Sequence, residues 1–315
     1  MKKRNTRTPV DLLDAIRYFA DPEICRQFLA EARWPDGVTC PRKGCGSKEV
    51  WFIKTRGIWR CKGCRKQFSV KVGTIFEDSP LGLDKWLPAV WLLTAATKGY
   101  SSHRLAHALS ITQKSAWFME HRIRFAMRTG GFEKPLSGEI EADTTGVGGK
   151  EKNKHASKRL HRGTGNVGKA IVFGLLARHG EVRAKSVPNE QAETLQPLIR
   201  QNVASGEVLY TDQASSFRGL QRDYAHDVIN HAEEFVRGRV HTNGIENFWS
   251  NFKRRIYGTH HFVMPWHLDR YLDDATFRFN TRKDSDGERF ALACSRTDGR
   301  RLTWKELTAN GPSDY

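Results

Sequence analysis

The sequence predicts an α/β protein in which a small cysteine-containing domain and a helical region precede a mixed β-sheet flanked by helices. Two observations support this prediction. Four of the six cysteines fall between residues 40 and 64, a grouping typical of a small metal-binding domain. Between residues 138 and 258, three strand-like runs come in succession and later strands alternate with helical stretches. That order favours a mixed sheet covered by helices.

The composition indicates a folded protein with no membrane partner. Hydrophobic residues make up 38% of the 315 residues, and no apolar run approaches the roughly 18 residues that a membrane span requires. The N-terminus, MKKRNTRTPVDLL, is basic but lacks the apolar core and cleavage site of a signal peptide. We therefore expect a cytoplasmic protein.

The charge points to a polyanionic partner. The net charge is +17, from 52 Lys and Arg against 35 Asp and Glu. Such an excess suggests phosphate binding, because basic side chains that neutralise phosphates release counterions. Charge alone leaves DNA, RNA and a merely soluble basic protein as alternatives.

The grouped cysteines have the spacing of a zinc ribbon. Cys40 and Cys45 are separated by four residues, Cys61 and Cys64 by two, and each pair has a glycine in its turn. The strand-like run between the pairs would bring four thiolates to one tetrahedral Zn²⁺. We expect this zinc to be structural, because four thiolates leave no open coordination position. Unrelated buried thiols are the alternative.

A helical region follows the cysteines. One long helix is expected from about Leu83 to Thr97, then a helix capped by Ser101 or Ser102, a short turn at 110–112, and a second helix with several basic residues. This is helix-turn-helix spacing, in which the second helix would enter the major groove of DNA. Plain helical packing is the alternative.

The second half of the chain has alternating strands and helices. The expected strands cover 138–143, 170–177, 181–187, 207–211 and 227–230, and the expected helices 190–202, 215–222, 242–258 and 267–282. Residues 144–149 are expected to form a glycine-containing turn. Residues 150–169 are expected to form a loop dense in Lys, Arg and His that faces phosphate.

The helix expected over 242–258 has two distinct faces. Its apolar face consists of Ile245, Phe248, Trp249 and Phe252. Glu246 and Lys253 lie about two turns apart on a neighbouring face, and Thr242 or Asn243 could cap the N-terminus. An ordinary amphipathic surface helix is the alternative.

Three carboxylates are candidates for a catalytic metal site. Asp143 and Asp212 each follow a strand-like run, and Glu246 would come from the helix packed on the sheet. If the two strands are neighbours, these carboxylates meet at one edge, where their repulsion would require hard divalent cations, Mg²⁺ or its substitute Mn²⁺. Two such ions can promote phosphodiester chemistry.

Each of these residues also has a simpler interpretation. Asp143 could form a turn, Asp212 could cap a short helix, and Glu246 could be a solvated helix residue. Asn243, one turn before Glu246, is the alternative third ligand. The candidate DNA-contacting cations are Lys253, Arg254 and Lys150.

Several stretches, in order along the chain, resemble one group of bacterial insertion-sequence transposases of the DDE type. Cys40 to Cys64 and residues 65–93 look like that group's zinc ribbon and linker. Residues 140–150, 209–217, 241–263 and 267–282 resemble its catalytic motifs. The resemblance covers nearly all of residues 35–282 and implies an RNase H-like catalytic domain. It also implies catalytic roles for Asp143, Asp212 and Glu246, with Lys253 as the downstream basic residue.

This chain departs from that pattern in three places. Relatives often have Asp-Glu where this chain has Asp143-Thr144, some use asparagine as the third ligand, and the first cysteine pair is more widely spaced than usual.

These observations predict a nucleoid-associated DNA transposase that binds terminal inverted repeats, hydrolyses a phosphodiester and joins the freed 3′ hydroxyl to target DNA. A non-catalytic DNA-binding regulator and an RNase H-like structure-selective nuclease are the alternatives. Pairing of two element ends implies a homodimer or higher oligomer on double-stranded DNA.

The expected segments are a helical lead-in (1–35), the zinc ribbon (36–76), a helix-turn-helix region (77–130), the catalytic domain (137–285) and a C-terminal tail (286–315).

Overall fold

A computed structural model of the chain describes residues 6–129, 134–149, 153, 155–159, 166–229 and 240–309. The chain divides into two compact units: Met1–Met127 together with Lys283–Tyr315, and Arg128–Arg282. The C-terminal residues therefore belong to the same unit as the N-terminal half of the chain. No helix among the described residues has both the length and the apolar composition needed to cross a membrane.

The first unit contains a small antiparallel sheet beside the cysteines. Its strands are β1 (Val50–Ile53), β2 (Ile58–Cys61) and β3 (Gln67–Phe68), in the order β1-β2-β3. The β1–β2 hairpin turns through the 3₁₀ segment Lys54–Arg56 and Gly57, whose φ of 62° is one that glycine adopts without strain. This hairpin brings the second cysteine pair back toward the first.

Helices make up the rest of the first unit. They are α1 (Leu12–Tyr18), α2 (Pro22–Arg33), α3 (Leu83–Ala95), α4 (Ser102–Leu109), α5 (Gln113–Met127), α9 (Asp286–Ser295) and α10 (Trp304–Thr308). The Ser101 side chain caps α4 by accepting from the Arg104 N–H. The α4–α5 pair has the short turn expected from the sequence.

Helix α9, which the sequence interpretation missed, lies in the core of this unit. Its Phe290 is fully buried and its ring centroid lies 5.5 Å from that of Phe28 and 5.2 Å from that of Trp91. A capping box of Ser285 and Glu288 begins the helix. That Ser-x-x-Glu pattern is the signal that could have identified it.

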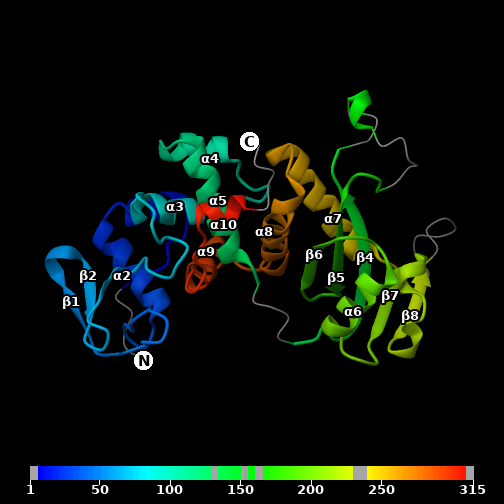
Figure 1. Ribbon diagram of the computed structural model, residues 1–315, viewed down its shortest axis with the longest axis horizontal. Coiled ribbons are helices and arrows are strands. Elements are labelled where there is room, and N and C mark those ends of the chain that lie inside the picture. The colour runs from blue at the N-terminus through cyan, green and yellow to red at the C-terminus, as the bar shows by residue number, and fades with distance from the viewer. Residues whose placement is uncertain are drawn as a thin grey trace. The chain divides into compact units, whose positions relative to one another are not determined.

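The second unit is built on the expected mixed sheet (Figure 1). Its strands are β4 (Glu139–Val147), β5 (Ala170–Ala177), β6 (Val182–Val187), β7 (Val208–Asp212) and β8 (Ala225–Ile229), in the spatial order β6-β5-β4-β7-β8. Strands β4, β5 and β6 pair antiparallel, whereas β7 pairs parallel with both β4 and β8. The arrangement confirms the predicted α/β class and is consistent with an RNase H-like domain.

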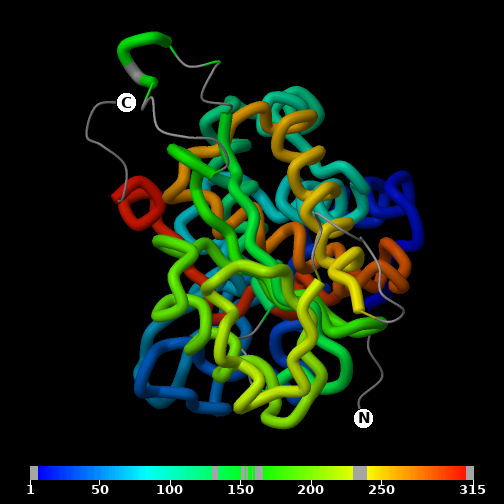
Figure 2. Tube along the Cα trace, turned by 90° about the vertical axis from the view of Figure 1, so that its right-hand side faces the viewer, coloured from blue at the N-terminus to red at the C-terminus, as the bar shows by residue number. Residues whose placement is uncertain are grey.

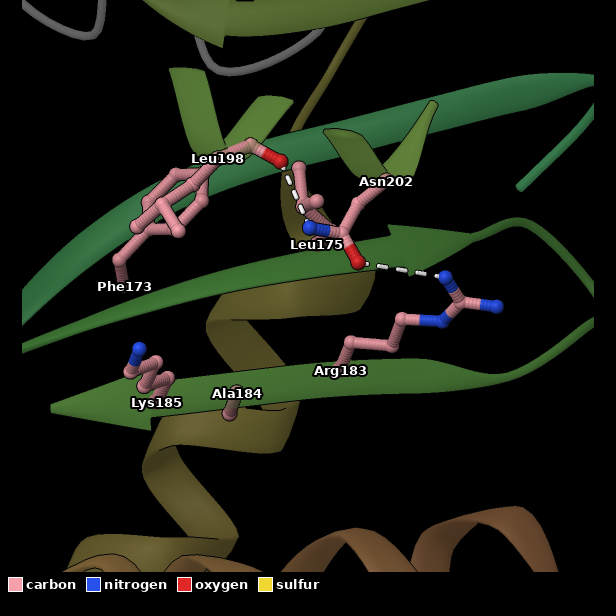
Figure 3. Close-up of a pocket in the computed structure, with 7 residues that line it drawn as sticks. All are labelled: Phe173, Leu175, Arg183, Ala184, Lys185, Leu198 and Asn202. Atoms are coloured by element: carbon pink, nitrogen blue, oxygen red, sulfur yellow. Dashed lines mark hydrogen bonds between the residues drawn. The ribbon is translucent and has the colours of Figure 1, made fainter. Parts of the chain in front are cut away.

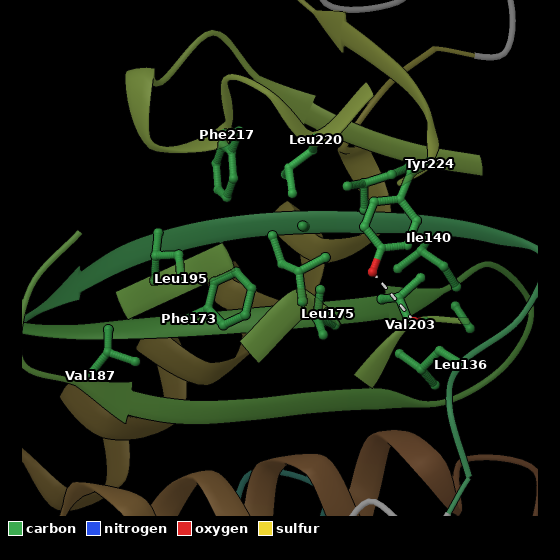
Figure 4. Close-up of a cluster of buried hydrophobic side chains, with 14 residues drawn as sticks. Leu136, Ile140, Phe173, Leu175, Val187, Leu195, Val203, Phe217, Leu220 and Tyr224 are labelled. Carbon is green, nitrogen blue, oxygen red and sulfur yellow. Dashed lines mark hydrogen bonds between the residues drawn. The ribbon is translucent and has the colours of Figure 1, made fainter. Parts of the chain in front are cut away.

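Hydrophobic cores cover both faces of this sheet. On one face, α6 (Ala192–Asn202) and the 3₁₀ segments Ser215–Phe217 and Leu220–Arg222 pack on strand residues such as Ile140 and Leu175 (Figure 4). On the other face lie α7 (Asn243–Arg255) and α8 (Leu268–Asn280). This second face is the one that carries the candidate site.

Two local predictions were wrong. Strand β4 does not end at Asp143 but continues to Val147, because residues 144–147 pair with residues 170–173 of β5. The stretch expected as a glycine-containing turn is therefore mostly strand. The helix expected over 215–222 is instead two short 3₁₀ segments.

Candidate active site

Asp143 and Asp212 occupy matching positions on neighbouring parallel strands. The β4–β7 register pairs Glu139 with Val208 and Glu141 with Tyr210. Continued for two residues, this register sets Asp143 beside Asp212, the last residue of β7. Residues in register on adjacent strands lie on the same face, with the strands about 4.8 Å apart. The two aspartates thus lie side by side on one face of the sheet, on two interior strands.

Glu246 comes from α7, which packs on that face (Figures 1 and 2). Burial, together with the negative charges of Asp212 and Glu246, raises the pKa of Asp143 to about 7. The three carboxylates are therefore close enough to influence one another electrostatically. Their carboxylate oxygens do not all lie within 4.8 Å of one another. Among the described residues, the four cysteines form the group of potential metal ligands whose atoms are that close together.

Three side chains or backbone groups of α7, spaced four residues apart, contact three side chains of β4 that are spaced two residues apart. Three hydrogen bonds join Ile245 N–H to Glu141 Oε2, Trp249 Nε1 to Asp143 Oδ2, and Lys253 Nζ to Thr145 Oγ1, at 2.8, 3.0 and 2.5 Å. Four helical residues rise about 6 Å and two strand residues about 6.6 Å. Residues four apart on α7 therefore match alternate residues of β4 on one face. Glu246 follows Ile245 in the first turn of the helix aligned in this way, and its charge acts on Asp143.

Two glycines permit α7 to approach the sheet this closely. Gly174 of β5 is paired with Asp143, and a Cβ on Gly174 would lie 2.6 Å from Cζ2 of Trp249. A Cβ on Gly244 would lie 2.5 Å from Leu176 Cδ2. Neither distance is compatible with ordinary packing, so larger residues at these positions would push α7 away from the carboxylates.

A buried ion-pair network supports the beginning of α7, and the sequence interpretation did not identify it. Glu141 is 1% exposed, and its Oε1 lies 2.9 Å from Nε of Arg178. The same guanidinium contacts Glu139 at 2.7 Å and donates to the carbonyl oxygen of His241 at 2.8 Å. The position of Glu141, two residues before Asp143 and thus on the same face of a strand, was the available signal.

This network replaces the helix cap expected from the sequence. Thr242 is the N-cap residue, but its side chain accepts no backbone N–H; instead its hydroxyl donates to Glu246 Oε1 at 3.1 Å. The Glu141 carboxylate accepts from the N–H of Ile245 in the first turn, where a negative charge is favourable. The first turn of α7, which carries Glu246, is thus fixed from the sheet.

The remaining candidates have different surroundings. Lys253 is partly buried, and burial together with the charge of Lys169 lowers its pKa, opposed by the attraction of Asp143. Arg254 is exposed and donates to the Ser250 hydroxyl at 3.0 Å. Asn243, the alternative third ligand, is exposed at the first position of α7. Lys150 lies outside the described residues.

Thr144, which occupies the position where relatives often have Glu, lies on the other face of β4. Its hydroxyl donates to Glu190 Oε1 at 2.8 Å. Because side chains alternate along a strand, a carboxylate at this position would not lie on the face that carries Asp143. The departure leaves the aspartate pair itself unchanged.

The four cysteines form a compact cluster with the geometry of a zinc site. Their sulfur atoms all lie within 4.8 Å of one another, with 3.7 Å between Cys40 and Cys64 and 3.6 Å between Cys45 and Cys61. Tetrahedral thiolates at a zinc–sulfur distance of about 2.3 Å would be about 3.8 Å apart. Without the metal, the backbone N–H of Cys64 lowers the pKa of Cys61 to about 7, whereas burial raises the pKa of Cys40 to about 12. The wider first pair therefore fits a structural Zn²⁺.

Comparison with known proteins gives two domain matches. Residues 135–280 match the ISXO2-like transposase domain, and residues 21–67 match the transposase zinc-ribbon domain. An uncharacterized transposase-like protein from Haemophilus influenzae is 36% identical over 95 residues, covering 30% of this chain and 76% of the relative. The chain belongs to the ISXO2-like transposase family.

A second relative of this transposase covers most of the chain. It is an uncharacterized protein in the transposable element ISH50 of Halobacterium salinarum, 27% identical over 274 residues, which are 82% of this chain and 90% of the relative. No solved structure gives a significant match.

The helix-turn-helix candidate of the transposase is only partly available to DNA. The first residues of α5, Gln113 and Lys114, are exposed, whereas Arg122 and Arg124 are buried. Arg122 donates to the Glu77 carbonyl oxygen, and Arg124 pairs with Glu120 at 3.1 Å. The basic residues of the second half of α5 therefore stabilise the protein, leaving the helix N-terminus as the DNA-facing candidate.

A separate hollow in the transposase domain contains none of the candidate residues. It is lined by Phe173, Leu175, Arg183, Ala184, Lys185, Leu198 and Asn202 (Figure 3). Phe173 and Leu175 belong to the core cluster on the α6 side of the sheet. This hollow is therefore not part of the carboxylate site.

Proposed function

We propose that this chain is an active DNA transposase that binds the terminal inverted repeats of its element and hydrolyses a phosphodiester at each end. The freed 3′ hydroxyl then attacks a phosphodiester of target DNA, which joins the element end to the target and releases a target 3′ hydroxyl. The observation that carries the proposal is the β4–β7 register, which sets Asp143 beside Asp212 on the face covered by α7. Family membership supports the reaction class, and the net charge of +17 supports a nucleic-acid substrate.

The carboxylates are suited to hold divalent metal ions. Asp143, Asp212 and Glu246 supply hard oxygen donors, which Mg²⁺ and Mn²⁺ prefer. When bound, such ions would polarise the phosphodiester and stabilise charge on the attacking and leaving oxygens. The raised pKa of Asp143, about 7, reflects its burial and the repulsion among these groups. Deprotonated Asp143 is the form that binds metal.

Neighbouring residues keep the carboxylates in position. The indole N–H of Trp249 donates to Asp143 at 3.0 Å and fixes one oxygen of that carboxylate. The Glu141–Arg178 network holds the first turn of α7 and with it Glu246. Lys253 reaches the same face through Thr145 and provides positive charge for a DNA phosphate beside the site.

We assign binding of the element-end DNA to the first unit. The zinc ribbon has exposed Trp51 and Phe52 on β1, and the Arg60 guanidinium lies 5.5 Å from the Trp51 ring centroid. Together with the exposed N-terminus of α5, these residues supply cationic and aromatic groups that suit contacts to nucleic acid. Pairing of two element ends would require at least a dimer on DNA.

The test is nicking and joining of labelled element-end oligonucleotides with Mg²⁺. Asp143→Asn and Asp212→Asn should abolish both steps while leaving DNA binding intact. Asp227→Asn, on the exposed part of β8, is the matched control and should behave like wild type. Glu246→Gln and Asn243→Ala compared in the same assay identify the third ligand.

Each alternative gives a distinct result. If wild type binds ends but cuts no better than Asp143→Asn, the protein is a DNA-binding regulator. If it cuts but never joins the 3′ end to target DNA, it is a nuclease. Either result would overturn the proposed transposition reaction.

A further inference from the structure

The segment after α7 carries an exposed tyrosine whose ring is held in place at one end. Tyr257 lies in the π-helical turn Ile256–His260 and is 45% exposed. Its hydroxyl donates to the carbonyl oxygen of Gly148, directly after β4, at 3.0 Å. Single π-helical turns, which occur mostly inside α-helices, are frequent at functional sites. The bond limits the motion of the ring while nearly half of the residue stays accessible.

Phe262, five residues farther along, is still more exposed and follows a strained turn. It is 60% exposed. The Phe262 N–H donates to the His260 carbonyl oxygen at 2.7 Å across His261, whose φ of 61° and ψ of −49° define a classic γ-turn. This turn is rare and strained for a residue other than glycine. A strained turn that ends in an exposed phenylalanine points to function.

The turn is anchored to α8 of the same unit. The His260 ring packs edge-on against Tyr271 of α8, with centroids 4.8 Å apart and an angle of 71°. Tyr271 is buried in the core that α7 and α8 share with the sheet. The exposed rings therefore belong to a fixed surface of the catalytic domain.

This surface adjoins the cations of the candidate site. Lys253, near the end of α7, lies about one turn before Tyr257, and its ammonium contacts Thr145, two residues from Asp143 on the same face of β4. Lys169 lies near Lys253 and near the Gly148 partner of Tyr257. Its charge acts on Lys253, and its side chain lies beside Gly148. Accessible aromatic rings among fixed cations are the combination that binds single-stranded nucleic acid, the cations tracking phosphates while the rings stack on bases.

We propose that Tyr257 and Phe262 form a stacking site for unpaired bases of the DNA strand that is processed at the carboxylates. The inference rests on the proposed transposase function, because that function supplies the DNA. Every base has a π-face, so stacking tolerates any sequence. The site would hold bases that open beside the cleaved phosphodiester, and it would have little affinity for a fully paired duplex.

The test compares binding of an oligo-dT strand carrying one 2-aminopurine with binding of a fully paired duplex of the same length. The full chain is used without added divalent metal, so no cutting occurs. Phe262→Ala and Tyr257→Ala should each weaken single-strand binding about 5- to 150-fold, the range for one stacked base. They should also reduce the change in 2-aminopurine fluorescence, with duplex affinity altered by less than about twofold.

Conservative variants separate stacking from structural effects. Phe262→Trp and Tyr257→Phe keep an aromatic ring and should retain single-strand binding. Val228→Ala, which removes another exposed apolar side chain of the same unit, should have no effect. Unchanged single-strand binding in both alanine variants, or equal losses on strand and duplex, would overturn the inference.

The result is independent of catalysis. Asp143→Asn should bind the single strand like wild type. Normal nicking and joining by wild type together with no stacking effect would refute the stacking site alone. Intact stacking without any nicking would instead refute the proposed reaction.

Discussion

At the scale of single residues, the candidate site is defined by one carboxyl group whose ionisation depends on its neighbours. The pKa of Asp143 rises from 3.8 to about 7 through burial and the charges of Asp212 and Glu246. A carboxyl group with a higher pKa in the folded chain binds more protons when folded. The stability that this group contributes is therefore present below pH 4 and is lost as the pH rises through about 7.

We predict that Asp143→Asn removes this pH dependence. For the metal-free wild type, the free energy of unfolding should fall by up to about 1.4 kcal/mol per pH unit between about pH 4 and 7 from this group alone. Urea unfolding at several pH values checks the slope. Added Mg²⁺ should raise wild-type stability at about pH 8 but have little effect on the variant. Parallel curves for the two proteins would contradict the assignment.

A second residue-scale feature is the buried pair of Glu141 and Arg178. Arg178 also lies over the Tyr210 ring, 4.2 Å from its centroid, and donates to the His241 carbonyl. Removing one member of a buried ion pair leaves the other charge uncompensated, which costs roughly 3–5 kcal/mol.

Arg178→Gln should therefore lower stability by about 3 kcal/mol or more, measured by urea unfolding. The double variant Glu141→Gln/Arg178→Gln should lose less than the sum of the single variants, because the buried charge is gone. Arg200→Gln, which removes the exposed arginine of an ion pair with the half-buried Asp223, is the matched control and should cost less than about 1 kcal/mol. Additive losses at Glu141 and Arg178 would argue against a coupled pair.

At the scale of elements, the site depends on how closely α7 can lie on β4 and β5. The helix presents Ile245, Trp249 and Lys253 at four-residue intervals, and the strand presents Glu141, Asp143 and Thr145 at two-residue intervals. This match holds only while the helix can sit over Gly174. The absence of a side chain at Gly174 thus controls how close Glu246 of α7 can come to Asp143 of β4.

We predict that Gly174→Ala raises the Mg²⁺ concentration needed for DNA cutting while the protein stays folded. The added methyl would meet the Trp249 ring, forcing the indole away from Asp143 at a cost of about 1–3 kcal/mol. Mg²⁺ titration of nicking activity should show a higher metal requirement. Gly149→Ala, where a Cβ meets nothing within 4 Å, is the control. An unchanged metal requirement in Gly174→Ala would show that α7 tolerates the displacement.

At the scale of the whole molecule, the chain combines a first unit that contains a zinc-ribbon domain with a second unit built on a mixed sheet. The ribbon strands are two to four residues long, too few to form a stable fold by hydrophobic burial alone. A zinc ion bound by four thiolates would supply the missing stabilisation, about 10–16 kcal/mol in isolated zinc fingers. The second unit has its own cores on both faces of its sheet.

Removal of zinc should therefore unfold the ribbon and leave the transposase domain folded. A zinc-selective chelator, or Cys61→Ser, should abolish amide exchange protection over residues 50–61 while protection over β4, β5 and β6 stays unchanged. Cys294→Ser, at a buried cysteine outside the cluster, controls for loss of a thiol. Protein that contains no zinc by mass spectrometry yet keeps a protected ribbon would contradict the prediction.

The features that the sequence alone determined are local ones. Cysteine spacing identified the ribbon, apolar runs located β5 and β7 almost to the residue, and periodicity placed α7 with Glu246 on it. These features are readable because strand and helix periods depend on neighbouring residues. The third carboxylate's identity and the DNA-contacting cations remain predictions.

Tertiary structure alone decided which distant groups meet. The pairing of β4 with β5 kept Asp143 inside a strand, and the β4–β7 register set it beside Asp212. Tertiary packing also joined Arg178 to Glu141. It placed α9 in the first unit, although α9 is separated along the chain by 150 or more residues from the helices that it contacts. No local pattern encodes these contacts, because they depend on the packing of whole elements whose separation along the chain leaves no periodic trace.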